Sequence, residues 1–266
     1  MSMIVQAVLN ILYTASIYYL VAMGIGLIYQ VARFYHMAHA GYISFGACAA
    51  WFFFERARMQ LPLCVIAASM LAALMAAASY VMLHRLLARR ASPAVNQLLI
   101  SFGVFIILES TLALIMGEDI RAFRHGLGGA IGAHGVFITP GQIVALSVAC
   151  LVFGGSLCWL HCTQAGLLHR AVSGDSSLAR SIGIRVDSVI VMGFAMGAGF
   201  AALAGALLAL DISASPRMGF TPMIMGIVAY AVGRGNVVIR PAAGALLLAS
   251  VQWIGARVFG GGWQEA

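Results

Sequence analysis

The sequence predicts an all-α integral membrane protein, a polytopic helical bundle of about eight hydrophobic segments. Of its 266 residues, 62% are hydrophobic and only 9% are charged, whereas a soluble domain carries about 25% charged residues. The mean hydropathy is +0.99. Several apolar runs reach the roughly 20 residues with which a helix crosses about 30 Å of hydrocarbon. Runs such as AASMLAALMAAASYVML (67–83) do not alternate in polarity, which disfavours a β-barrel.

Charged residues and turn formers delimit the hydrophobic segments. The first segment is too long for a signal-peptide core and no Lys or Arg precedes it, so we expect a retained span. The seventh is short, with Pro216 and Pro222 at its start and Gly233 at its end. This pattern predicts a half-helix or a re-entrant element, which is tolerated where protein or a cavity covers the backbone. The segments lie near 4–29, 38–54, 61–83, 97–116, 141–161, 189–210, 218–232 and 241–258.

The sixth segment carries small residues at four-residue spacing, which predicts one helix face that a neighbouring helix approaches closely. This stripe consists of Gly193, Gly197, Ala201 and Gly205.

The basic residues indicate the orientation in the membrane. All 15 are Arg, and without Lys the chain cannot contain a P-loop. If the segments alternate in direction, one side holds nine Arg and two Asp (+7) and the other six Arg and five acidic residues (+1). The positive-inside rule places the first side in the cytoplasm. We then expect the C-terminus outside, and a last span to be absent from this chain.

Metal-binding and catalytic patterns are weak. The five cysteines show no CxxC spacing and suit small buried apolar positions. His36 and His39 form an HxxH without the Glu of HExxH. No GxSxG elbow occurs, and no second acidic residue within a span accompanies Glu109. We therefore expect no catalytic residue, no metal and no cofactor in this chain, and an intramembrane enzyme is disfavoured.

A polar stretch, AGLLHRAVSGDSSLARSIGIRVD (165–187), separates two apolar segments. Asp175 is a good N-cap and Gly183 a good C-terminal residue, so 175–183 predicts a short capped helix. The preceding AGLLHRAV has apolar residues at helical spacing around Arg170. By itself this stretch fits either a solvated connector or a docking element for a cytoplasmic partner.

The stretch resembles the ATPase-coupling loop of ABC importer permeases, in particular the branched-chain amino acid and urea/amide branch. Two further motifs resemble the same family in the same order, GLIYQVARFYHMAHAGYISFGA (26–47) and VGRGN (232–236). The family pattern is T-x-x-G-x-x-x-RA-x-x-x-D-x-x-x-A-x-x-x-GI, met here by Thr163, Gly166, Arg170, Ala171, Asp175, Ala179, Gly183 and Ile184.

The resemblance implies one transmembrane permease domain over 1–266, with a coupling loop at about 162–188. Arg170 and Arg180 would contact a separate cytoplasmic ABC ATPase, which uses ATP, while Asp175 caps the docking helix and Gly183 ends it. Further partners would be a second permease subunit, related or identical, an external solute-binding protein facing 117–135, and the lipid bilayer, but no nucleic acid. The location would be the bacterial inner membrane. The solute would be a branched-chain amino acid, with urea or an amide as alternatives.

Polar residues within spans are costly and are therefore candidates for the translocation path. Glu109 is the acidic candidate, although a pairing with a neighbouring helix explains it equally well. Weaker candidates are His39, Tyr42, Ser44 and Ser101. The two serines are weak because Ser and Thr in a span often bond only their own backbone. The alternative function is an ion-coupled secondary transporter, which needs an ion-binding site at broken helices with ionisable groups. In that case the segment 216–235 would be the broken helix, and Glu109 would be the ionisable group.

Overall fold

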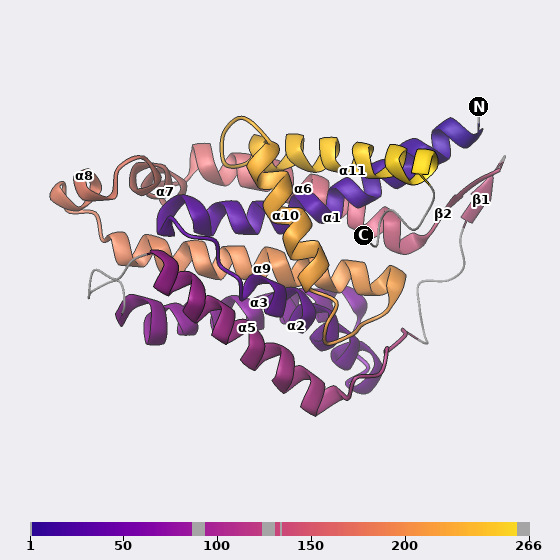
Figure 1. Cartoon of the computed structure of the whole chain (residues 1–266), viewed down its shortest axis with the longest axis horizontal. Helices are drawn as coiled ribbons and strands as arrows, with labels where there is room; N and C mark the ends of the chain where they lie inside the picture. The colour runs from indigo at the N-terminus through magenta and orange to yellow at the C-terminus, as the bar shows by residue number, and fades with distance from the viewer. Residues whose placement is uncertain (1, 87–93, 124–130, 134, 260–266) are drawn as a thin grey trace.

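The computed structural model describes residues 2–86, 94–123, 131–133 and 135–259, which form a helical bundle (Figure 1). Two π-helical turns, η1 (Phe52–Arg56) and η2 (Tyr80–His84), extend α2 and α3. The helices are α1 (Ser2–Ala32), α2 (His39–Trp51), α3 (Leu61–Ser79), α5 (Ala94–Met116), α6 (Pro140–Cys162), α7 (Gln164–Gly174), α8 (Ser176–Ser181), α9 (Val186–Ile212), α10 (Phe220–Val232) and α11 (Ile239–Phe259).

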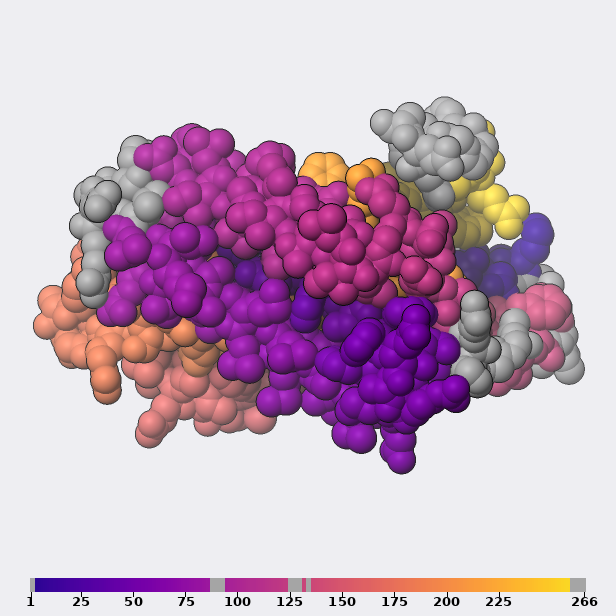
Figure 2. Space-filling model, turned by 90° about the horizontal axis from the view of Figure 1, so that it is seen from below, coloured from indigo at the N-terminus to yellow at the C-terminus, as the bar shows by residue number. Residues whose placement is uncertain are grey.

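The helix lengths confirm the all-α membrane fold. Among the described residues, five helical stretches are long and apolar enough to cross a bilayer. Their outward faces are apolar: Leu74 of α3 is 66% exposed and Leu151 of α6 is 74% exposed. Figure 2 shows the face that α3 and α5 build, in purple and magenta. The five stretches are Met3–Ala32, Leu61–His84, Ala94–Met116, Pro140–Cys162 and Val186–Ile212.

Helix α9 lies at the centre and packs against α1, α2 and α3. A Cβ atom built on Gly197 would lie 2.6 Å from the carbonyl oxygen of Gly24 in α1. One built on Gly205 would lie 2.0 Å from the carbonyl oxygen of Ile43 in α2. The small-residue stripe of the sixth segment therefore packs as the sequence predicts, with backbones in direct contact on two sides.

Two non-helical segments run into the bundle interior. Residues 33–38 lead from the end of α1 to the start of α2 (Figure 1). There the ring of His39 lies against Gly24, in the C-terminal third of α1. Residues 213–219 lead from α9 to α10, where the Gly219 N–H donates to Ser44 Oγ at 2.9 Å. The seventh hydrophobic segment is thus a short helix of 13 residues, preceded by an inward-running loop. Ala214, Pro216 and Gly219 of this loop are buried, whereas Arg217 is exposed at one end of the bundle.

The two ends of the bundle differ. One end carries α7 and α8, and we call it the α8 end (Figure 1). The opposite end carries the hairpin β1 (Ile131–Ala133) and β2 (Val136–Ile138), and we call it the hairpin end. The antiparallel hairpin pairs Gly132 with Phe137, and the sequence analysis did not predict it.

Charged residues that the sequence count assigns to opposite sides lie at opposite ends of the bundle in the following cases. At the α8 end, Arg85 Nε lies 3.1 Å from Asp187 Oδ2. At the hairpin end, Arg121 exchanges backbone hydrogen bonds with Ala214, and Arg217 Nη2 lies 2.6 Å from Glu118 Oε1. Arg89, Arg90, Arg124 and Glu265 of that count lie outside the described residues.

We predict that Gly205→Ala destabilises the protein, because its Cβ would overlap the α2 backbone and overpacking typically costs about 1–3 kcal/mol. Gly199→Ala on the same helix is the matched control, since its Cβ would meet Ser69 O at 3.7 Å, an ordinary contact. Thermal unfolding in detergent measures the difference. Equal melting temperatures for the two variants would show that α9 and α2 are not in backbone contact.

Candidate functional site

The junction between α6 and α7 is built around Thr163. Its backbone is extended, which ends α6, and its Oγ1 accepts from the Gly166 N–H at 3.0 Å, which caps α7. The same hydroxyl donates to the Trp159 carbonyl at 2.7 Å. A Cβ on Gly166 would lie 2.2 Å from Trp159 O, so α7 folds back tightly on α6.

Helix α7 is anchored to the end of α1 by a buried histidine. His169 Nε2 lies 3.2 Å from the Leu27 carbonyl, and the ring meets Trp159 edge-on at 5.5 Å. A carbonyl only accepts, so Nε2 carries the proton. Burial lowers the pKa of His169, against the smaller opposing effect of the bond to Leu27. The neutral ring therefore fits this site.

Helix α8 has defined caps at both ends. Asp175 Oδ1 accepts from the N–H groups of Ser177 and Leu178, at 2.8 and 3.1 Å. After the helix, Gly183 has a φ of +89°, and the Ile184 N–H donates to the Ala179 carbonyl at 3.0 Å. These caps match the sequence prediction, and a positive φ favours glycine at position 183.

A small apolar cluster fixes α8 against the bundle. Ala179 is 3% exposed and belongs to a cluster with Val172 of α7, Val186 of α9 and Val31 of α1. Arg33 adds a hydrogen bond from its guanidinium to the Ser173 carbonyl. Helix α7 thus contacts both central helices, α1 and α9, and α8 contacts α7 and α9.

The outward face of α8 combines apolar and basic side chains. Leu178 is 62% exposed and the C-cap residue Ile182 is 69% exposed. Arg180 of α8 is exposed as well, as is Arg170 of the neighbouring α7. A hollow of about 460 Å³ beside α8 is lined by Arg85, Arg180, Arg185 and Asp187, among others. Sequence analysis singled out Arg170 and Arg180 but missed Leu178 and Ile182, whose four-residue spacing on one helix face was the available signal.

The weaker path candidates lie in the interior and hold helices together. Tyr42 Oη lies 3.1 Å from Ser79 Oγ. Ser44 accepts from the Gly219 N–H. Ser101 donates to the carbonyl of Leu98 in its own helix and accepts from the N–H of Met37 at 3.0 Å.

His39 and Glu109 differ from these three. His39 is fully buried, with its ring packed against Gly24 of α1. Glu109 Oε1 lies 3.5 Å from Arg217 Nε, and its side chain is 26% exposed. Tyr42, Ser44 and Ser101 thus bond to neighbouring segments, whereas Glu109 is partly exposed beside an arginine.

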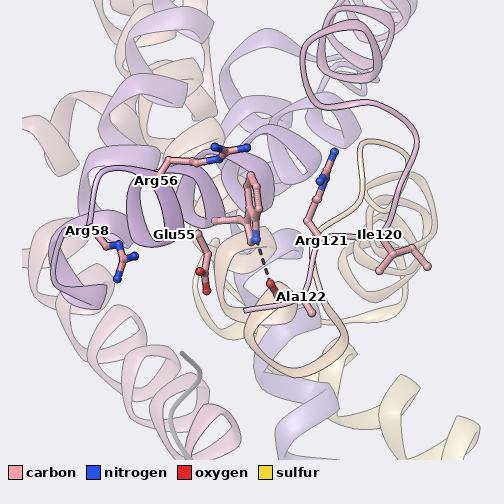
Figure 3. Close-up of a pocket in the computed structure, with 7 residues that line it drawn as sticks. Glu55, Arg56, Arg58, Ile120, Arg121 and Ala122 are labelled. Atoms are coloured by element: carbon pink, nitrogen blue, oxygen red, sulfur yellow. Dashed lines mark hydrogen bonds between the residues drawn. The ribbon is translucent and has the colours of Figure 1, made fainter. Parts of the chain in front are cut away.

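A basic hollow of about 480 Å³ lies at the hairpin end (Figure 3). Figure 3 shows Glu55, Arg56 and Arg58 on one segment and Arg121 on another. Arg121 lies over the Trp51 ring at 5.6 Å, and its Nε is buried without a partner within the described ranges. Three Arg and one Glu give the hollow a net positive charge, which suits the binding of carboxylates.

In the described part of the chain, no group of three His, Cys, Asp or Glu residues could hold a metal ion.

Comparison with known proteins places these features in a family. Residues 7–262 match the family described as branched-chain amino acid transport system / permease component. The chain is 25% identical to the high-affinity branched-chain amino acid transport system permease protein BraD of Pseudomonas aeruginosa, over 98% of this chain and 89% of that protein. It is 26% identical to LivH of Salmonella typhimurium and to LivH of Escherichia coli K12, each named as such a permease, over 91% of this chain and 83% of those proteins. The chain belongs to the permease-component family of branched-chain amino acid transport systems.

Proposed function

We propose that this chain is the permease subunit of an ABC importer for a branched-chain amino acid, and that α7 and α8 couple it to a separate cytoplasmic ATPase. The observation that carries the coupling role is the outward face of α8, where Leu178 and Ile182 are exposed beside Arg180 on a helix with both ends capped. Exposed apolar side chains rimmed by charge mark protein contacts. The relatives' names supply the solute class, and they do not favour the ion-coupled transporter.

Coupling would run through the contacts that anchor the loop. A force on α8 reaches α9 through Ala179 and Val186, and reaches α1 through Val31. The hydrogen bond from His169 to Leu27 links α7 to α1 independently. ATPase closure would therefore move α1 and α9, the two helices on which the bundle is built. ATP would be bound by the partner, since a chain without Lys has no P-loop, and this subunit would need no cofactor.

The hairpin end would face a solute-binding protein. Its basic hollow, with Arg56, Arg58 and Arg121, complements carboxylates on a partner surface, and such charges mainly steer association. Glu109, 26% exposed beside Arg217, would lie at the entrance of the path. His39, Tyr42, Ser44 and Ser101 remain proposed path residues whose buried contacts would have to open. The location would be the bacterial inner membrane, with a second permease subunit alongside.

Leu178→Ala/Ile182→Ala is expected to weaken retention of the ATPase about tenfold or more, as truncation of central interface residues does. Tagged chain is purified from membranes that also contain the ATPase, and the ratio of the two proteins is measured. Ile120→Ala, at a side chain 73% exposed at the hairpin end, is the control and should retain the ATPase fully. Equal retention in all samples contradicts the coupling role of α8.

Asp175→Ala should also lower retention, because loss of an N-cap costs about 1 kcal/mol. Asp175→Asn keeps the acceptor oxygen and removes the charge, so it should behave as the wild type. Binding affinities of the two variants for the ATPase separate the cap from the charge. A loss with Asn as large as that with Ala would assign Asp175 a direct ionic contact instead.

Arg56→Glu/Arg58→Glu should slow leucine uptake in proteoliposomes supplied with the solute-binding protein and raise the amount of that protein needed for half-maximal uptake. The reason is like-charge repulsion at a rim that steers association, and the effect should diminish as salt rises. Arg56→Lys/Arg58→Lys retains the charge and is the control. If the Glu variant needs no more binding protein than the Lys variant, this hollow is not the docking surface.

A further inference from the structure

A polar groove runs along the bundle between α1, α10 and α11. On α1, Gln6, Asn10, Thr14 and Tyr18 recur at four-residue spacing and therefore lie on one helix face. Three of these residues line the groove together with Thr221 of α10 and Gln252 of α11. The groove has a volume of about 270 Å³. Asn10 and Thr14 belong to the N-terminal half of α1, which is the half nearest the hairpin end (Figure 1).

Hydrogen bonds connect both ends of this polar face of α1 to neighbouring segments. At the hairpin end, the Gln6 amide bonds the Phe137 backbone N–H and carbonyl at 2.8 and 3.0 Å and donates to Asn10 Oδ1 at 3.1 Å. Near the middle of α1, Tyr18 Oη donates to Gln252 Oε1 at 2.8 Å. Gln252 Nε2 lies 3.4 Å from the sulfur of Met225 in α10. The second set of contacts joins all three helices and closes the inner end of the groove.

Two hydroxyl groups of the groove, those of Thr14 and Thr221, lie between these two sets of hydrogen bonds. Thr14 lies in mid-helix, yet within the described residues neither Thr14 nor Thr221 forms a side-chain hydrogen bond. Some hydroxyls on other helices donate to the carbonyl one turn back, as Thr111 does to Ile107 at 2.6 Å and Ser147 to Ile143 at 2.8 Å. A free hydroxyl in hydrocarbon costs free energy. The free hydroxyls therefore indicate that this face meets water or a polar ligand.

We propose that this groove is the outer half of the solute route and binds a zwitterionic amino acid with an apolar side chain. The proposal rests on the proposed function, in which a second permease subunit covers the groove and shields it from lipid. It also adds residues to that function, because none of the path candidates Glu109, His39, Tyr42, Ser44 and Ser101 lines this groove.

The lining sets the class of solute. None of the lining side chains carries a charge at neutral pH, so a net-charged solute would lose its hydration without a compensating partner. The amides of Asn10 and Gln252 and the free hydroxyls offer donors for a carboxylate and acceptors for an ammonium group. Ile11, Met225 and Trp253 supply apolar surface for the side chain.

The experiment is thiol labelling in membranes that contain the complete transporter. The five native cysteines are first replaced, because Cys150, Cys158 and Cys162 are exposed. Thr14→Cys and Thr221→Cys are then treated with sulfonatoethyl methanethiosulfonate, which reacts with thiols in water and does not enter lipid. We expect both to be labelled, with at least fivefold slower labelling in excess leucine. Ser147→Cys on α6, whose native hydroxyl bonds its own backbone, is the matched control and should stay unlabelled.

A second variant tests the hydroxyl itself. Because Thr14 has no internal hydrogen bond, Thr14→Val should fold as the wild type and retain the ATPase. It should raise the KM for leucine uptake roughly 3- to 10-fold, the loss of one hydrogen bond to a ligand. Thr111→Val is the matched control and should leave the KM unchanged.

The outcomes separate the two proposals. If the ATPase is retained but Thr14→Cys and Thr221→Cys react no faster than Ser147→Cys, the groove faces lipid or protein and this inference fails alone. Labelling that leucine does not slow, together with an unchanged KM for Thr14→Val, also overturns it. If no ATPase is retained by the wild type, the proposed function fails, and the inference that rests on it fails with it.

Discussion

The approach of the α9 backbone to the backbones of α1 and α2 is the constraint on which the rest of this structure depends. Gly197 faces the Gly24 carbonyl, and Gly205 faces the Ile43 carbonyl, at separations that leave no room for a Cβ atom. In a bilayer, lipid competes for apolar surface, so helices associate through such close packing rather than through hydrophobic burial. With α9 held on two sides, α3, α5 and α6 can leave apolar faces outward.

The same contact places the two proposed functional surfaces at opposite ends of α1. At the α8 end, His169 and Val31 join α7 and α8 to α1. Toward the hairpin end, α1 presents its row of polar side chains beside α10 and α11. A rigid helix of 31 residues spans about 46 Å at 1.5 Å per residue. If α1 moves as a rigid body, a displacement of its α8 end also displaces its hairpin end, with no need for a chain of side-chain contacts between them.

The polar residues of the bundle interior form hydrogen bonds that the hydroxyl groups of the groove do not form. Ser44 and Ser101 satisfy backbone N–H groups at the ends of the inward-running loops, Gly219 and Met37 respectively. An unsatisfied N–H would be costly at that depth. Their hydrogen bonds explain how two short helices, α2 and α10, begin inside the bundle. Thr14 and Thr221 form no such bonds among the described residues, and in the proposal they bond the solute instead.

The sequence by itself determined the fold class, the positions of the main helices, the caps of α8 and the small-residue face of α9. These features depend on local composition and spacing, which each segment carries without its neighbours. Only the tertiary structure decided that Ser44, Tyr42 and Ser101 hold helices together, that Leu178 and Ile182 are exposed, and that Asn10, Thr221 and Gln252 share one groove. The physical reason is that burial and partnership of a polar group depend on which helix lies opposite, and residues such as Tyr18 and Gln252 meet across more than 200 positions of chain.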